Sequence, residues 1–147
     1  MKLSTRGRYG ARALLDIALH QGDEPIPLKD VALRQQISLR YLNHLITPLV
    51  AAGILRSARG TGGGVRLAKR PDEIKLSEVM QLLEGSIALV DCVDDPDMCT
   101  RSGICAARDL WEELKQAMSG ILESMTLQDL VERQKAKEPC EEVMYQM

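Results

Sequence analysis

The chain has 147 residues, and with 45% hydrophobic and 27% charged residues it can bury a core, which excludes a disordered protein. No apolar stretch could cross a membrane and no signal-peptide pattern opens the chain, so we expect a cytoplasmic protein without a membrane partner. Residues 1–70 carry 12 Lys and Arg against 4 Asp and Glu, whereas residues 71–147 carry 7 against 17, which predicts a polyanionic partner for the first part.

Three helices are predicted in the basic part. Apolar residues recur at steps of three and four along residues 5–21, and the same periodicity marks residues 28–35 and 39–52. A tight turn at 36–38 joins the second helix to the third, and Ser38 is placed to cap the third helix. This arrangement is typical of a helix-turn-helix.

A β-hairpin is predicted directly after the third helix. Two short strands, residues 54–58 and 65–68, flank a glycine-rich tip at 59–64. The fold class that follows is mainly α with a small β-hairpin. We therefore assign residues 1–86 to a winged helix-turn-helix DNA-binding domain.

The acidic part is predicted to hold one long helix and little other regular structure. A short helix covers residues 77–83, and residues 87–106 form a cysteine-bearing loop without sustained periodicity. Residues 107–134 are assigned to dimerisation helices, with a break near Thr126. Residues 135–147 have little to pack against and are expected to form a mobile tail.

The long helix carries an apolar seam at steps of three and four. A seam of this kind suits pairing with a second copy of the chain, although it is also compatible with a core helix of one chain. The residues of the seam are Trp111, Leu114, Met118, Ile121 and Met125. A homodimer would place two reading helices at half-sites about one DNA turn apart, on a roughly palindromic double-stranded operator.

The predicted DNA contacts lie on the third helix and the wing. Arginine can bind guanine, asparagine can bind adenine, and tyrosine can contact phosphate or a thymine methyl group. An arginine on a glycine-rich tip suits insertion into a minor groove. The predicted DNA-binding residues are Ser38, Arg40, Tyr41, Asn43, His44, Arg59 and Gly60. Two alternatives are a merely solvated helix face and a winged-helix module that binds protein instead of DNA.

An enzyme is not expected. His20 and His44 are the only histidines, and both lie in the predicted DNA-binding part. No combination of nucleophile, base and orienting group can be identified in the sequence.

Three cysteines, Cys92, Cys99 and Cys105, lie within fourteen residues of one acidic loop. The paired Cys-x2-Cys spacing of structural zinc sites is absent, and wider spacings can surround a larger iron–sulfur core. Spacing alone only weakly favours an iron–sulfur cluster over zinc, and a thiol-redox switch without a cluster is the alternative. Neighbouring aspartates add negative charge that a cationic group would relieve.

These motifs together resemble the IscR/NsrR/CymR family of bacterial winged-helix transcriptional regulators. The resemblance rests on residues 1–9, on Ile37 to Leu42, on the wing from Arg59 to Leu67, and on the three-cysteine loop followed by 109–111. It implies a homodimeric DNA-binding regulator, expected to be a repressor. Its cluster, 2Fe-2S rather than 4Fe-4S, would report iron–sulfur supply, redox state or nitric oxide.

The chain departs from the family's patterns at the cluster's fourth ligand. IscR-like members have a histidine where this chain has Arg108, and NsrR-like members have a carboxylate that falls at Arg8. The fourth ligand stays open among Arg108, the aspartates and the lone tail cysteine; the remaining candidates are Asp91, Asp94, Asp95, Asp97, Asp109 and Cys140.

A second departure lies on the reading helix. Asn43 replaces the glutamate of IscR-like members, and asparagine does not repel phosphate or base acceptors. We therefore expect that loss of the cluster changes the choice of operator less in this protein.

Overall fold

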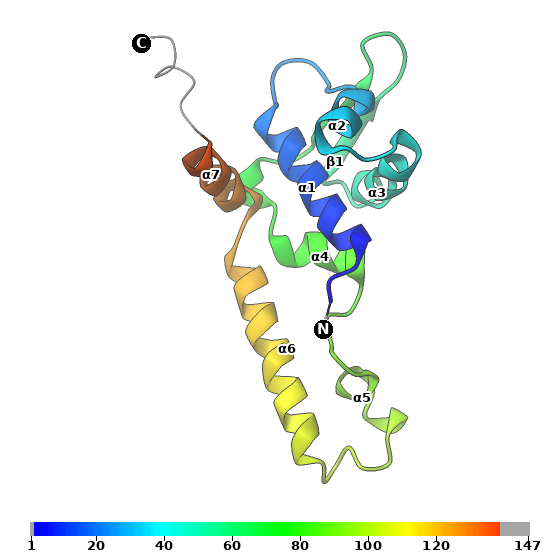
Figure 1. Ribbon diagram of the computed structural model, residues 1–147, viewed down its shortest axis with the longest axis vertical. Helices are drawn as coiled ribbons and strands as arrows, with labels where there is room; N and C mark the ends of the chain where they lie inside the picture. The colour runs from blue at the N-terminus through cyan, green and yellow to red at the C-terminus, as the bar shows by residue number, and fades with distance from the viewer. Residues whose placement is uncertain (1, 139–147) are drawn as a thin grey trace.

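The structure, a computed structural model, describes residues 2–138 and confirms a mainly helical fold with a small hairpin (Figure 1). Its elements are α1 (Thr5–Leu19), α2 (Leu28–Gln35), α3 (Leu39–Ala51), β1 (Leu55–Ala58), β2 (Gly64–Leu67), η1 (Pro71–Glu73), α4 (Leu76–Glu84), α5 (Asp91–Asp94), η2 (Pro96–Met98), α6 (Ala106–Ser124) and α7 (Leu127–Lys137).

Helix α1 lies at the centre of the first domain and touches α2, α3, α4 and α7. The hydroxyl of Ser4 caps its first turn by accepting a hydrogen bond from the Gly7 amide at 3.2 Å. A Cβ atom at Gly10 would lie 2.5 Å from Leu83 Cδ1, so this glycine lets α4 approach α1 closely. Small residues on α1 thus set the distance between these two helices.

The wing is a two-stranded antiparallel sheet in which Arg56 pairs with Arg66 and Ser57 with Val65. Ile26, in the loop before α2, extends it by one bridge: Ile26 and Val65 exchange two backbone hydrogen bonds of 2.8 Å. The sequence analysis did not predict this pairing of the loop before α2 with the wing. This bridge fixes the root of the wing to the helix-turn-helix.

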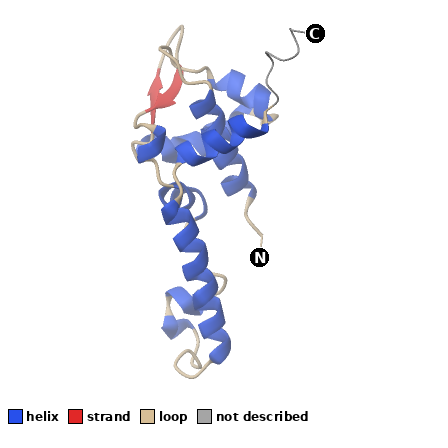
Figure 2. Ribbon diagram, turned by 90° about the vertical axis from the view of Figure 1, so that its left-hand side faces the viewer, coloured by secondary structure: helices blue, strands red, loops and turns tan. Residues whose placement is uncertain are grey.

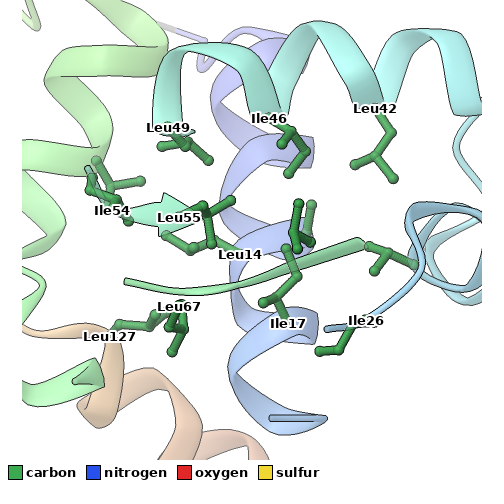
Figure 3. Packing of buried hydrophobic residues seen from close by; sticks show 14 of the residues in the cluster. Leu14, Ile17, Ile26, Leu42, Ile46, Leu49, Ile54, Leu55, Leu67 and Leu127 are labelled. Atoms are coloured by element: carbon green, nitrogen blue, oxygen red, sulfur yellow. The ribbon is translucent and has the colours of Figure 1, made fainter. Parts of the chain in front are cut away.

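Aliphatic side chains from α1, α3 and the wing fill one core (Figure 3). Leu14 and Ile17 of α1 meet Leu42 and Leu49 of α3, and each of the four is at most 1% exposed. Leu55 and Leu67 of the wing pack beside them. Their burial, at about 25 cal/mol per Å² of apolar surface, holds the reading helix and the wing in one rigid unit.

The cysteine-bearing segment is not the structureless loop that the sequence analysis predicted. It contains the short helix α5 and the 3-10 turn η2. Asp95 caps η2 by accepting a hydrogen bond from the Asp97 amide at 3.1 Å. Helix α6 follows and extends away from the first domain, with α5 and η2 beside its first turns (Figure 2). None of its residues is fully buried.

Helix α7 packs on the core of the first domain, although the sequence analysis grouped it with α6 as dimerisation helices; that grouping stays a prediction. Leu127 is 1% exposed and Val131 4% exposed, and α7 packs against α1. Thr126 begins the helix with a capping box shared with Asp129. The helix ends at Lys137, three residues later than predicted; the rest of the expected tail, with Cys140, lies outside the described residues.

Candidate nucleic-acid interface and cysteine segment

The turn before α3 is fixed by backbone and side-chain hydrogen bonds. Gln36 adopts a left-handed conformation (φ 56°), and the Ile37 amide donates to the Ala32 carbonyl at 3.0 Å. Ser38 caps α3, its hydroxyl accepting from the Tyr41 amide at 3.1 Å. The first turns of α3 are thereby held at the surface.

Four predicted DNA-binding residues share the outer face of α3. Arg40, Asn43 and His44 are exposed, and Tyr41 is half-buried. The Asn43 amide donates to the Leu39 carbonyl at 3.1 Å, so this side chain lies along its own helix in the free protein. It must rotate to reach a base.

Two polar residues that the sequence analysis missed adjoin this face. Thr47 lies one turn beyond Asn43, is exposed, and donates from its hydroxyl to the Asn43 carbonyl at 2.7 Å. Tyr9 of α1 meets Tyr41 edge-on with ring centroids 6.2 Å apart. An i+4 step from Asn43 could have indicated Thr47, but only the packing of α1 on α3 reveals Tyr9.

Two arginines lie near the ring of Tyr9, next to the reading helix. The guanidinium groups of Arg8 and Arg12 lie 5.5 and 5.2 Å from the centroid of its ring, within the range of cation–π contacts. Arg12 further donates to the Gln35 carbonyl at 2.9 Å, which ties α1 to the end of α2. Through its contact with Tyr9, Tyr41 thus packs against α1.

Arg59 and Gly60 stand at the tip of the wing. Gly60 has φ 88°, a conformation that favours glycine, and its carbonyl accepts from the Gly63 amide at 2.9 Å to close the turn. At the base of the turn, a Cβ atom on Gly64 would lie 2.1 Å from the Ile26 carbonyl oxygen. The glycines thus serve a tight turn and a close strand approach, and Arg59, directly before Gly60, is left exposed.

Basic side chains of the first part fall into paired and unpaired groups. Arg34, Lys69 and Arg70 form ion pairs with Asp16, Glu78 and Asp72 at 2.7, 3.7 and 2.9 Å. A second group has no carboxylate partner within residues 2–138, and it lies at the start of α1, on α3 and on the wing: Arg6, Arg8, Arg40, Arg56, Arg59 and Arg66. Unpaired positive charge therefore lies on the reading helix, at the start of α1 and on the wing.

The three neighbouring cysteines lie on three consecutive pieces of the segment between α4 and α6. Cys92 is in α5, Cys99 follows η2, and Cys105 is the N-cap of α6. All three are free thiols; Cys92 and Cys105 are half-buried and Cys99 is exposed. Among residues 2–138, no three Cys, His, Asp or Glu side chains are close enough to hold a metal ion. The structure thus places the thiols in one segment without bringing them together.

Arg108 occupies the position of the histidine expected from the family resemblance and binds the backbone instead. Its Nε donates to the Cys92 carbonyl at 3.0 Å, and its Nη2 lies 3.8 Å from a carboxylate oxygen of Glu112. The side chain is only 20% exposed. Arg108 therefore fastens α5 to the first turns of α6.

Asp94 makes a second connection between α5 and α6. Lys115 Nζ donates to Asp94 at 2.8 Å, and Ser86 donates to the other carboxylate oxygen. The hydrogen bond from Lys115, and then that from Ser86, hold the pKa of Asp94 below its ordinary value of 3.8. This commitment makes Asp94 a poorer candidate for the fourth ligand than Asp91, Asp97 or Asp109.

The dimer seam predicted on α6 is partly available. Ile121 is 60% exposed, whereas Trp111, Leu114, Met118 and Met125 are half-buried. Leu110, which the sequence analysis did not assign to the seam, is 50% exposed and lies about one helical turn before Leu114 and about three turns before Ile121. The described helices include none long and apolar enough to span a membrane.

Comparison with known proteins identifies relatives along nearly the whole chain. Residues 3–133 match the Rrf2 family, described as iron-dependent transcriptional regulator. The protein named rrf2 of Nitratidesulfovibrio vulgaris is 43% identical over 131 residues, which cover 89% of this chain and 87% of that protein.

Two solved structures share the fold. IscR of T. potens superposes with a TM-score of 0.77 at 34% identity, covering 99% of this chain and 96% of its own. CymR of B. subtilis, entitled the global cysteine regulator, has a TM-score of 0.76 at 35% identity, covering 90% of this chain and 98% of its own.

Proposed function

Because this chain belongs to the Rrf2 family of DNA-binding transcriptional regulators, which are not enzymes and act as dimers, we propose that it reads a roughly palindromic operator as a homodimer and senses iron–sulfur, redox or nitric oxide status through Cys92, Cys99 and Cys105. As a regulator of chromosomal genes, it would act in the cytoplasm, as a repressor.

The DNA-binding assignment is carried by one observation: the unpaired arginines gather around a capped, exposed helix and its wing. Arg40 and Asn43 on α3 would read base edges in the major groove, and Arg59 would enter the neighbouring minor groove. Ser38, Tyr41, His44 and the Gly60 backbone would position these contacts on the phosphates.

The donor chemistry of the cysteine segment fits an iron–sulfur cluster at three positions. Thiolates are the usual ligands of such clusters, and all three thiols are free on one short segment. Cys99, exposed and between two short turns, belongs to the part that would close on the cluster. We propose a 2Fe-2S cluster held by these thiols; when bound, it would supply a redox-active and oxidant-labile centre.

The fourth ligand is proposed to be other than Arg108, since its guanidinium is engaged by the Cys92 carbonyl and by the Glu112 carboxylate. Asp91, Asp97 and Asp109 have no ion-pair partner among the described residues and remain candidates, together with Cys140. An oxygen ligand would make the cluster more labile than full cysteine ligation does.

A second function is favoured by the likeness to CymR. The cysteines would then act as a thiol-redox switch or a zinc site, with DNA binding unchanged. A solved structure of Staphylococcus aureus CymR in an oxidized form, with a TM-score of 0.73, belongs to the same set of neighbours.

Anaerobic purification separates these functions. A cluster regulator should show visible absorption with bound iron and sulfide, and should lose both in Cys92→Ser, Cys99→Ser and Cys105→Ser variants. Cys140→Ser is the matched test of the tail cysteine: an unchanged spectrum excludes it as fourth ligand. A colourless protein with zinc or with reactive thiols would contradict the cluster.

DNA binding is tested by titrating a labelled operator at several salt concentrations. Affinity should fall steeply with salt, and Arg59→Ala and Tyr41→Ala should weaken it. A protein-interaction module would show neither effect. The role of Asn43 is tested by measuring the affinities of cluster-loaded and apo protein for two operator classes. We expect the preference between the two classes to change only slightly when the cluster is lost.

A further inference from the structure

Two arginines face each other across the wing. The antiparallel register places Arg56 of β1 directly opposite Arg66 of β2, which brings their Cβ atoms to about 5 Å. Like charges at directly opposed positions destabilise a sheet. A protein that keeps such a pair without a counter-charge has stored repulsion that an anionic ligand can relieve.

The pair lies on the outer face of the wing, away from α3. Side chains alternate along a strand, and Leu55, Val65 and Leu67 of the other face are buried in the core. Ser57, next to Arg56, lines a cavity together with Asn43 and Thr47 of α3. By strand alternation, Arg56 and Arg66 point to the face opposite to Leu55, Val65 and Leu67, away from the core that α3 helps to form.

No carboxylate neutralises either guanidinium within residues 2–138. The next basic residues along the chain differ, since Lys69 pairs with Glu78 at 3.7 Å and Arg70 with Asp72 at 2.9 Å. Arg56 is exposed, and Arg66 is half-buried beside it. The outer face thus carries two positive charges that the folded chain leaves without a partner.

We infer that Arg56 and Arg66 bind DNA phosphates on the far ridge of the minor groove that receives Arg59. The inference rests on the proposed DNA binding, in which α3 fills the adjacent major groove. The backbone ridge between the two grooves then lies against the inner face of the wing, near Ser57 and Thr47. The outer face meets the opposite ridge, whose phosphates supply the missing negative charge.

The test is the salt dependence of operator binding by an Arg56→Gln/Arg66→Gln variant. At a slope of about 0.9 per phosphate, loss of four contacts per dimer should reduce the slope of log K against log salt by about 3 to 4. Because the repulsion is removed, the melting temperature should stay equal or rise by about 1–3 °C.

Two control variants separate local contact from net charge. A Lys69→Gln/Arg70→Gln variant removes the same charge from paired residues and should keep a slope near that of the parent protein. An Arg56→Lys/Arg66→Lys variant keeps the charge and should retain most of the slope. Equal loss in the Lys69→Gln/Arg70→Gln control would overturn the inference.

Duplexes with neutral methylphosphonate linkages locate the contact. Neutral linkages on the far ridge should lower the affinity of the parent protein for the duplex and leave the affinity of the Arg56→Gln/Arg66→Gln variant unchanged. The reverse pattern would overturn the inference. If the parent protein binds normally, an unchanged salt slope in the Arg56→Gln/Arg66→Gln variant would also overturn the inference. Weaker dimerisation of that variant would overturn it too, because the arginines would then contact the acidic part of the partner subunit. A parent protein that binds no duplex would instead refute the proposed function itself.

Discussion

At the residue scale, single side chains fix the helix-turn-helix and the cysteine segment. Asp16 of α1 is 2% exposed and accepts three hydrogen bonds from Arg34, the shortest at 2.7 Å, and one from Gln35 at 2.8 Å. Arg108 similarly fastens Cys92 to α6. Each residue holds one element against another by charge-assisted hydrogen bonds, which are roughly twice as strong as neutral ones.

Replacing Asp16 with Asn should destabilise the fold. The change leaves Arg34 without its counter-charge in a partly buried place, and we expect a loss of about 2–3 kcal/mol in the free energy of unfolding. Urea unfolding followed by circular dichroism measures it. Asp72→Asn, which breaks the exposed pair with Arg70, should cost less than about 0.5 kcal/mol. Equal losses in both variants would contradict a special role for Asp16.

Arg108→His should lengthen the life of the proposed cluster. The substitution supplies the histidine that the family resemblance leads one to expect, and an imidazole ligand in place of a proposed oxygen ligand slows loss of the cluster. The decay of visible absorbance in air measures this. Arg108→Ala removes the contact with the Cys92 carbonyl without adding a ligand, so its cluster should decay at least as fast as the parent's. A slower decay in Arg108→Ala would mean that the arginine itself destabilises the cluster.

At the element scale, α6 is the one long helix that leaves the core. Its inner face meets α4 and α5, and its other side exposes Leu110 and Ile121. Short helix α5 depends on α6 for its position, through Arg108 and through the pair of Asp94 with Lys115. A change in the cysteine segment therefore reaches α6 directly.

Ile121→Glu should dissociate the dimer. A carboxylate in the apolar seam would be buried without a partner, so we expect dimerisation to weaken by at least about tenfold. Analytical ultracentrifugation measures it. Gln116→Glu, exposed on the opposite side of α6, adds the same charge and should leave the dimer intact. A dimer unaffected by Ile121→Glu would assign the interface elsewhere.

Lys115→Met should loosen α5 without unfolding the first domain. The change removes the 2.8 Å contact with Asp94, and amide exchange over residues 91–98 should quicken by about two- to fivefold. Lys75→Met breaks the pair with Glu123 at 3.5 Å and serves as the control, since that pair joins α6 to the start of α4 and includes no residue of α5. Unchanged exchange in α5 would show that Arg108 holds it alone.

At the scale of the whole molecule, the two kinds of chemistry occupy separate regions. The wing and α3 lie in the first domain, and the cysteine segment lies at the far end of α6 (Figure 1). The charge follows the same division, with 12 basic against 4 acidic residues before residue 71 and 7 against 17 after it. This separation lets the reading surface stay rigid while the cysteine segment changes.

A dimer with fixed spacing should be sensitive to the phase of its operator. Inserting five base pairs between half-sites turns one of them to the opposite side of the duplex, and affinity should fall by about 100-fold as bivalent binding is lost. Electrophoretic mobility shifts measure it. Inserting ten base pairs restores the phase and should recover part of the affinity if the dimer can stretch. Equal affinity for all spacings would indicate independent monomers.

Much of the fold was predictable because it depends on patterns of residues that are close together in the sequence. Apolar periodicity marked α1 to α3, Ser38 marked the cap of α3, and the glycine-rich tip marked the wing, all confirmed by the structure. The predicted reading residues of α3 do share one surface. Contacts between distant segments were not predictable: the Ile26 bridge, the Tyr9–Tyr41 contact and the docking of α7 depend on tertiary packing.

The sequence by itself determined the winged helix-turn-helix, the charge division and the three cysteines, since each depends on residue type and on spacing along the chain. Only the tertiary structure decided which arginines lack a counter-charge and that Arg56 and Arg66 share the outer face of the wing. It also decided that Arg108 binds the Cys92 carbonyl. Pairing between charges depends on distance in space, and folding sets that distance between residues far apart in the chain.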